Sequence, residues 1–254
     1  MEGLGLFING TFINLFYPKV QREELIRYSR QMILPEIGLQ GQEKIKDAKV
    51  LIIGAGGLGC PVLQYLSSTG VGTLGIIDFD KVELHNLHRQ ILYSQKDIGK
   101  QKALVAAEKL SKQNPSSLLK VFNEMLNENN VFDIISQFDI VVDGSDNFLT
   151  RYLVNDTCVK LNKPLVYGSI LKFEGQLTVF NHNGSKGLRD LFPEPPNPED
   201  VPNCDENGVL GTMPGIIGLM MAQETLKLII GLETLRNQLL IVDTINWTYT
   251  LVKY

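Results

Sequence analysis

The chain has 254 residues, with 24 Lys and Arg against 28 Asp and Glu, a net charge of −4, and 44% hydrophobic residues. This is an ordinary globular composition, long enough for one large or two small domains. The slight acidity excludes a basic nucleic-acid binder, and three scattered cysteines exclude a disulfide framework. We expect no nucleic-acid partner and a reducing compartment, either a cytoplasm or an organelle stroma.

No membrane span is predicted, because no run reaches the ~18 consecutive apolar residues that a membrane helix needs. The apolar N-terminus lacks a basic segment and is interrupted by glycine and asparagine, which does not fit a signal peptide. We expect an N-terminal arm over residues 1–20 and a single domain over residues 21–254.

Helical and strand patterns alternate from residue 21 onward. Helices are predicted over 21–31, 40–46, 58–68, 100–112, 131–137 and 148–161. Strands are predicted over 49–53, 73–78, 118–122, 138–143 and 165–167. This alternation implies right-handed crossovers and a doubly wound, mostly parallel sheet of the Rossmann type, with a nucleotide-binding part at about residues 48–170.

The pattern changes after residue 174. Residues 176–180 alternate with period two, an apolar helix is predicted over 216–230, and strands are predicted over 238–242 and 248–252. The helix serves the core or a dimer surface, and we expect the core. Between these elements, residues 181–211 form a long loop rich in proline and glycine, which in a compact domain is usually functional or mobile. We expect an irregular C-terminal part that adds antiparallel strands.

A glycine-rich motif, Gly54-Ala55-Gly56-Gly57-Leu58-Gly59, lies between the first strand and the next helix. Glycines there permit a tight turn and let backbone N–H groups approach a phosphate at the helix N-terminus. Asp78 ends the next strand. Its distance in sequence from Gly59 is close to the ~20 residues expected for an acid that binds the ribose of a nucleotide. Together these features indicate a nucleotide site.

The residues that follow favour a triphosphate. Arg89 and Lys102 come from separate segments, and two cations suit phosphate oxygens better than a neutral nicotinamide ring. Asp146, in the run Asp143-Gly144-Ser145-Asp146-Asn147, could hold Mg²⁺ against the phosphates. Asp, Ser and Asn also favour helix N-caps, so one carboxylate could cap the helix while the other binds metal.

These motifs, in this order, resemble the MoeB/ThiF/HesA family, which is related to ubiquitin-activating enzymes. The resemblance spans about residues 24 to 243. It rests on Arg27-Tyr28-Ser29-Arg30-Gln31, the glycine motif, Asp78-Phe79-Asp80, Asn86-Leu87-His88-Arg89-Gln90, Lys102, Asp146-Asn147, and Asn203-Cys204 before Gly208-Val209.

The resemblance implies ATP-dependent adenylation of the C-terminal glycine of a ubiquitin-like sulfur carrier that ends in Gly-Gly. The carrier type nearest in pattern is the molybdopterin synthase small subunit of molybdenum cofactor biosynthesis, and the thiamine-pathway carrier is the alternative. An arginine equivalent to Arg30 reaches the partner subunit's site in this family, which implies a homodimer. Losing such an arginine typically costs ~10³-fold or more in rate.

By matching position, Arg89 and Lys102 would hold phosphate oxygens, Asp146 would bind Mg²⁺, Asp78 would bind the ribose hydroxyls, and Asn86 would orient the phosphates. Arg30, Arg89, Lys102 and Asp146 are thus the expected catalytic residues. The nucleotide-binding set implied by the resemblance is Gly54, Gly56, Gly57, Gly59, Asp78, Asp80, His85, Asn86, Leu87, His88, Arg89, Lys102, Asp146 and Asn147.

The sequence departs from the family at its usual zinc site, which is built from two C-x-x-C pairs. The first position reads Gly187-Leu188-Arg189-Asp190, and the chain ends at Tyr254 before the second. We therefore expect no structural zinc, and a loop that is held by packing alone or is mobile. Cys204 matches a cysteine that some members link to the carrier, but its acidic neighbours disfavour a reactive thiolate. An NAD-dependent oxidoreductase and a non-catalytic nucleotide-binding module remain as alternatives.

Overall fold

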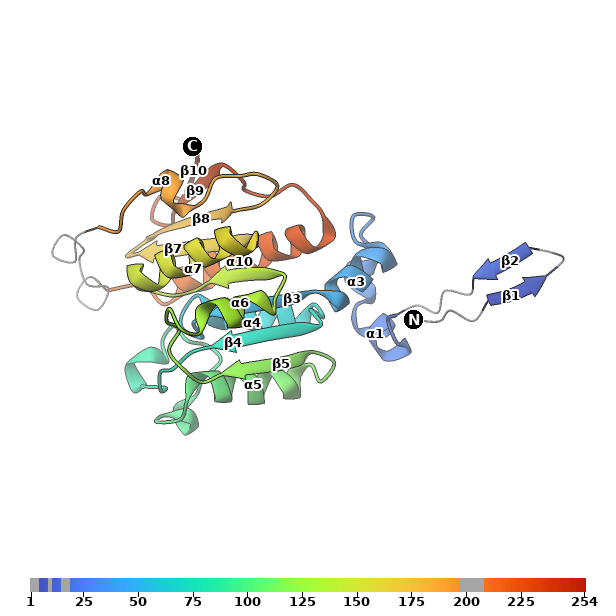
Figure 1. Cartoon of the computed structure of the whole chain (residues 1–254). Coiled ribbons are helices and arrows are strands. Elements are labelled where there is room, and N and C mark those ends of the chain that lie inside the picture. The colour runs from blue at the N-terminus through green and yellow to red at the C-terminus, as the bar shows by residue number, and fades with distance from the viewer. Residues whose placement is uncertain (1–4, 9–10, 15–18, 197–207) are drawn as a thin grey trace.

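The computed structural model describes the chain except for residues 1–4, 9–10, 15–18 and 197–207. Near the N-terminus, strands β1 (Gly5–Ile8) and β2 (Thr11–Asn14) pair as a separate antiparallel sheet (Figure 1). The sequence predicts only an arm there, and this hairpin was not expected.

The domain is built on an eight-stranded sheet in the order β10-β9-β8-β7-β6-β3-β4-β5. Strands β3 to β7 are parallel to one another, and β8, β9 and β10 add antiparallel pairs. This confirms the predicted doubly wound sheet with antiparallel C-terminal strands. The strands are β3 (Lys49–Ile53), β4 (Thr73–Ile77), β5 (Leu118–Phe122), β6 (Ile140–Asp143), β7 (Leu165–Leu171), β8 (Glu174–Phe180), β9 (Gln238–Asp243) and β10 (Thr248–Lys253).

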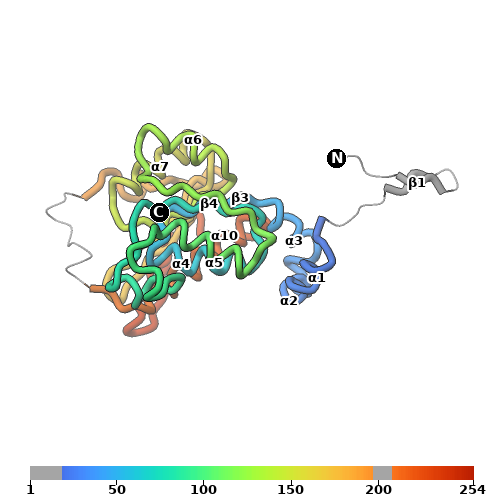
Figure 2. Tube along the Cα trace, turned by 90° about the horizontal axis from the view of Figure 1, so that it is seen from below, coloured from blue at the N-terminus to red at the C-terminus, as the bar shows by residue number. Residues whose placement is uncertain are grey.

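Helices cover both faces of this sheet. Ile52 and Leu51, neighbours on β3, are buried in different hydrophobic clusters, because successive strand side chains point to opposite faces. Figure 2 shows α6 and α7 on one side and α4, α5 and α10 on the other. The helices are α3 (Gly38–Asp47), α4 (Gly59–Ser68), α5 (Lys102–Gln113), α6 (Val131–Ser136), α7 (Phe148–Leu161) and α10 (Thr212–Ile230).

The predicted helix over 21–31 is divided into α1 (Arg22–Arg27) and α2 (Ser29–Met32). Tyr28, between them, is 3% exposed, and its hydroxyl accepts a hydrogen bond from Asn114 Nδ2 at 2.8 Å. The backbone at Tyr28 has φ −98° and ψ 7°, outside the helical region, so one helix ends there and the next begins. α1, α2 and α3 lie beyond the amino ends of the parallel strands (Figure 1).

Helix α10 is long and apolar enough to cross a membrane by length and composition. Its inner face packs on the sheet, with Met213, Ile217 and Met221 fully buried. The core helices of globular domains meet the same criteria, and this contact confirms the expected core role.

The described part of the long loop is tied to α7. Here α8 (Leu188–Leu191) forms, and the Arg189 guanidinium donates to both carboxylate oxygens of Asp156 at 2.8 Å. Arg189 also lies over the Tyr152 ring at 4.9 Å, and the Tyr152 hydroxyl contacts the carbonyl oxygens of Phe192 and Glu194 at 2.9 and 2.7 Å. The expectation of packing alone or mobility is therefore corrected for residues 187–194.

Candidate active site

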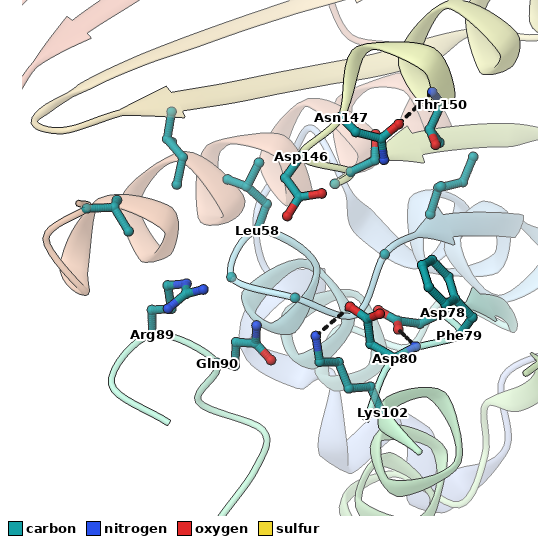
Figure 3. A pocket seen from close by; sticks show the side chains of 18 of the residues that line it. Leu58, Asp78, Phe79, Asp80, Arg89, Gln90, Lys102, Asp146, Asn147 and Thr150 are labelled. Carbon is teal, nitrogen blue, oxygen red and sulfur yellow. Dashed lines mark hydrogen bonds and ion pairs between the residues drawn. The ribbon is translucent and has the colours of Figure 1, made fainter. Parts of the chain in front are cut away.

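A cavity of about 490 Å³ opens at the carboxyl ends of the parallel strands. The segments after β3, β4, β5 and β6 and the end of β7 contribute to its wall, as expected for a ligand site in a sheet of this type (Figure 3). Of the expected site residues, the lining includes Gly54, Gly56, Gly57, Asp78, Asp80, His85, His88, Arg89, Lys102, Asp146 and Asn147.

The glycine motif forms a tight turn between β3 and α4. Gly54 has φ +84°, a left-handed conformation that side-chain-bearing residues rarely adopt. Gly59 lies behind the cavity wall, where a Cβ atom would come within 1.9 Å of the Gly54 carbonyl oxygen. The motif therefore lets α4 begin directly against the strand end, with its N-terminus at the cavity.

Asp78 links the glycine turn to the next strand. Its carboxylate accepts hydrogen bonds from the backbone N–H of Ala55 at 2.7 Å and of Asp80 at 2.8 Å. Asp78 is 9% exposed and lines the cavity. Burial raises the pKa of this carboxyl, and the two N–H donors oppose the rise. Asp78 thus orders the turn and keeps an edge facing the cavity.

Lys102 is held before any ligand binds. Its Nζ lies 2.9 Å from Asp80 Oδ2, and its side chain is 7% exposed (Figure 3). The Lys102 backbone N–H also donates to the Asp80 carbonyl oxygen at 2.9 Å. Asp80, expected to contact the nucleotide, therefore also fixes the direction of the Lys102 ammonium group.

Arg89 follows the short helix η1 (Leu84–Asn86). Its Nη1 donates to the His85 carbonyl oxygen at 3.1 Å. Asn86 is buried and accepts the Glu83 N–H with its side chain, while its carbonyl oxygen accepts the N–H groups of Arg89 and Gln90. Neither Asn86 nor Leu87 belongs to the cavity lining. Instead of facing a phosphate, the expected role, Asn86 shapes the segment that carries Arg89.

The β6–α7 turn presents Asp146. Asn147 caps α7, since its Oδ1 accepts the Thr150 N–H at 2.8 Å. The cap is therefore an amide and not one of the carboxylates that the sequence suggested. Within the described part of the chain, the Asp146 carboxylate has no hydrogen bond or ion pair, and it points toward the cavity in Figure 3.

These residues fit a phosphate-bound Mg²⁺. Among the described residues, no three His, Cys, Asp or Glu side chains group as a metal site. Mg²⁺ commonly takes one or two carboxylates plus substrate phosphates. The exposed Asp146 carboxylate, which lines the same cavity as Arg89 and Lys102, is consistent with that mode.

The remaining expected residues lie elsewhere. Arg30 is exposed on α2. This helix lies beside α1 and α3, beyond the end of the sheet opposite to the cavity (Figure 2). Cys204 lies outside the described residues.

Several lining residues were not identified from the sequence. Phe79 and Gln90 belong to the motifs that carry the resemblance, but neither is among the expected nucleotide-binding residues. The segment 124–126 follows β5 at its carboxyl end, where ligands bind in such sheets, so the topology was the missed signal. Arg151 and Lys172 had no signal in the sequence pattern.

The cavity offers different chemistry along its wall. Phe79, Met125 and Leu126 give an apolar region suited to a base, and the glycine turn gives backbone facing the middle. Arg89, Lys102 and Asp146 give the charged part. This combination suits a nucleotide with several phosphates better than a neutral ligand.

Comparisons with known proteins identify the family of this chain. The ThiF family model matches residues 28–254. The sulfur carrier protein adenylyltransferase of Thermus thermophilus is 49% identical over 234 residues, covering 90% of this chain and 86% of that protein. The adenylyltransferase and sulfurtransferase MOCS3 of Culex quinquefasciatus is 50% identical over 226 residues, covering 89% of this chain and 52% of that protein. This chain therefore spans about half the length of its MOCS3 relative.

The fold is also found among solved structures. The crystal structure of E. coli MccB with MccA-N7isoASN superposes with a TM-score of 0.80 at 22% identity, covering 90% of this chain and 71% of that chain. This likeness concerns the fold alone.

Proposed function

Because the chain belongs to the ThiF family and is an adenylyltransferase, we propose that it adenylates the C-terminal glycine of a ubiquitin-like sulfur carrier ending in Gly-Gly. The substrate carrier we propose is of the molybdopterin synthase small-subunit type. A relative of this chain that is 49% identical is named a sulfur carrier protein adenylyltransferase, which supports the carrier class.

One observation carries this proposal: Arg89, Lys102 and Asp146, from three separate segments, line one cavity beside the glycine turn. A terminal carboxylate has a pKa near ~3.5 and is ionised at pH 7, so it needs no general base. The obstacle is repulsion, since two anions must meet. Fixed cations lower that repulsion without reorganising during the reaction.

In the proposed reaction, a carboxylate oxygen of the carrier attacks the α-phosphorus of ATP. The bond from that phosphorus to the bridging oxygen breaks, and pyrophosphate leaves with its electron pair. The products are the acyl-adenylate and pyrophosphate. Arg89 and Lys102 bind the phosphate oxygens, Asp78 binds the ribose hydroxyls, and Asp146 would hold Mg²⁺, which supplies further charge neutralisation when bound.

Arg30 completes the site from a second copy of the chain in this proposal. Within one chain it is exposed and lies beyond the opposite end of the sheet. The same region exposes Ile26 and Ile33, at 69% and 70%. Exposed apolar side chains beside a cation support a contact surface for another subunit.

Isotope exchange tests the proposal. The protein is incubated with labelled pyrophosphate, ATP, Mg²⁺ and a carrier of either the molybdopterin or the thiamine type, and label is measured in ATP. We expect exchange that requires the carrier and is faster with the molybdopterin type. A carrier truncated by its last glycine is the control and should give none.

Other outcomes identify the alternatives. Faster exchange with the thiamine-type carrier reassigns the substrate. Tight ATP binding without exchange indicates a non-catalytic module. Binding of NADH in preference to ATP contradicts the proposal altogether.

A further inference from the structure

A buried arginine lies behind the turn that carries Asp146. Arg151, in the first turn of α7, is 7% exposed and reaches the cavity wall. Its Nη2 donates to the Ser145 carbonyl oxygen at 2.8 Å, and its guanidinium centre lies 4.8 Å from the centre of the Tyr167 ring. One side chain therefore connects α7, β7 and the β6–α7 turn.

Asp143, the last residue of β6, stabilises the same turn through hydrogen bonds. It is fully buried, and its Oδ1 accepts hydrogen bonds from Ser145 N at 2.9 Å and Ser145 Oγ at 2.6 Å. A buried carboxylate is costly without a nearby cation. Burial raises the pKa of Asp143, and the charge of Arg151 opposes that rise. Arg151 thus supports both ends of the turn.

Two atoms of this cluster lack hydrogen-bond partners among the described residues. They are Arg151 Nη1 and Asp143 Oδ2, and both are buried. An unpaired buried polar group destabilises the fold, because it has lost its hydrogen bonds to water. Such groups are rare and call for an explanation other than packing. A hydrophobic side chain would fill this place without that cost.

We infer that Arg151 is a positioning residue for adenylation, which fixes the Ser145–Asp146 turn so that the Asp146 carboxylate faces the phosphates. The inference rests on the proposed function, because it is there that Asp146 acts on the nucleotide. Arg151 acts through this turn and does not itself contact ATP.

Four variants test the inference: Arg151→Met, Asp146→Asn, the double variant, and Lys160→Met as a control. Lys160 is exposed on the same helix, so its replacement also removes a cation from α7. ATP affinity is measured directly, with and without Mg²⁺, and exchange is measured in parallel.

We expect Arg151→Met to reduce the Mg²⁺-dependent gain in ATP affinity by about 10–100-fold, as for residues that orient a metal ligand. ATP affinity without Mg²⁺ and the KM for the carrier should stay unchanged. The double variant should be no weaker than Asp146→Asn, because residues that act as a unit are not additive. Lys160→Met should match the wild type.

Arg151→Lys keeps the positive charge but not the planar guanidinium group, so it should retain part of the Mg²⁺-dependent gain in ATP affinity. It also keeps the inference testable if Arg151→Met does not fold. The inference is overturned if Arg151→Met folds and keeps the full Mg²⁺-dependent gain in ATP affinity. It is also overturned if the losses of the two single variants multiply in the double variant. If the wild type gains ATP affinity from Mg²⁺ but shows no carrier-dependent exchange, the proposed function is refuted. The ATP-binding measurements on the variants still test the role of Arg151 in that case.

Discussion

Lys102 shows how a single side chain is prepared for a charged ligand. Its ammonium group is mostly buried and paired with Asp80, whose carboxylate is half exposed to the cavity. A cation left to move would lose side-chain freedom when the phosphates bind. Because Asp80 already fixes Lys102, that cost falls on folding and not on catalysis.

Asp80→Asn tests this arrangement. The amide keeps the size of the carboxylate but loses the charge-assisted bond to Lys102 Nζ. Hydrogen bonds to charged groups contribute about 1.5–3 kcal/mol, less where exposed, so we expect kcat/KM for ATP in the exchange reaction to fall about 10-fold. Asp133→Asn, an exposed acid on α6, is the matched control. Equal kcat/KM in both variants would show that Asp80 does not position Lys102.

The sequence predicts the charged and glycine residues of the cavity, because their chemistry can be inferred from residue type and spacing. It placed Asn86 facing the phosphates, whereas the structure uses its side chain and carbonyl within the chain. Arg151 was missed because a lone arginine inside a helix is usually a solvated surface residue. Its burial depends on Tyr167 and Asp143, which come from strands that the sequence cannot place side by side.

At the scale of elements, the segment between β4 and α5 carries Arg89 on irregular backbone. Asp97, in the short helix η2 (Gln95–Asp97), stabilises the end of this segment that lies nearer α5. The Asp97 carboxylate accepts hydrogen bonds from Ser94 N at 2.9 Å and Ser94 Oγ at 2.7 Å, and it pairs with Lys109 of α5. Burial would raise the pKa of Asp97, but the bonds from Lys109 and Ser94 hold the pKa below its usual range.

A depressed pKa gives Asp97 a defined effect on stability. Its contribution is complete above the unfolded pKa of about 3.9 and is lost as the pH falls below that value toward the folded pKa. We expect Asp97→Asn to lower the Tm at pH 7 by about 3 °C or more. The difference from wild type should shrink below pH ~4. A thermal-unfolding series between pH 7 and pH 3 measures both, and a gap that is constant with pH contradicts this role.

Helix α8 makes a second prediction at this scale. Arg189→Ala removes the pair with Asp156 and the contact with the Tyr152 ring. Exposed pairs of these kinds stabilise a fold only weakly, so we expect amide exchange across residues 187–192 to accelerate about 5–10-fold with little change in Tm. Lys186→Ala, an exposed neighbour, is the control for exchange measured by mass spectrometry. Unchanged exchange in Arg189→Ala would mean that packing alone holds α8.

Regular elements were predicted best where a clear hydrophobic pattern is bounded by turn or cap residues. The strands 49–53 and 118–122 and the helix 148–161 agree with the structure to the residue. The short helices η1, η2 and α8 were missed, because three or four residues do not complete a helical period and are held by side-chain caps and tertiary contacts.

At the scale of the whole molecule, the sheet separates the cavity from Arg30. The cavity lies at the carboxyl ends of the parallel strands, and α1 to α3 lie beyond their amino ends (Figure 1). If Arg30 serves catalysis, it therefore does so in another copy of the chain. A two-fold dimer would provide two such sites, each built from both subunits.

Mixing two inactive variants tests this shared site. Arg30→Ala subunits keep an intact cavity, and Lys102→Ala subunits keep an intact Arg30. Each variant alone should lose ~10³-fold in exchange activity, as for an arginine supplied in trans. After random mixing, half of the dimers are mixed and each holds one intact site, so activity should recover to about one quarter of wild type. Mixing Lys102→Ala with Asp146→Asn is the control, because both lesions lie in the cavity of one chain. Neither cavity of such a mixed dimer is intact, so this mixture should stay inactive, and recovery would mean that the cavity residues come from different subunits. Mixing Lys102→Ala with a Lys102→Ala, Arg30→Ala double variant leaves no intact cavity and should stay inactive. Flat activity in the first mixture, with exchange of subunits confirmed by mass, would place Arg30 outside the catalytic site.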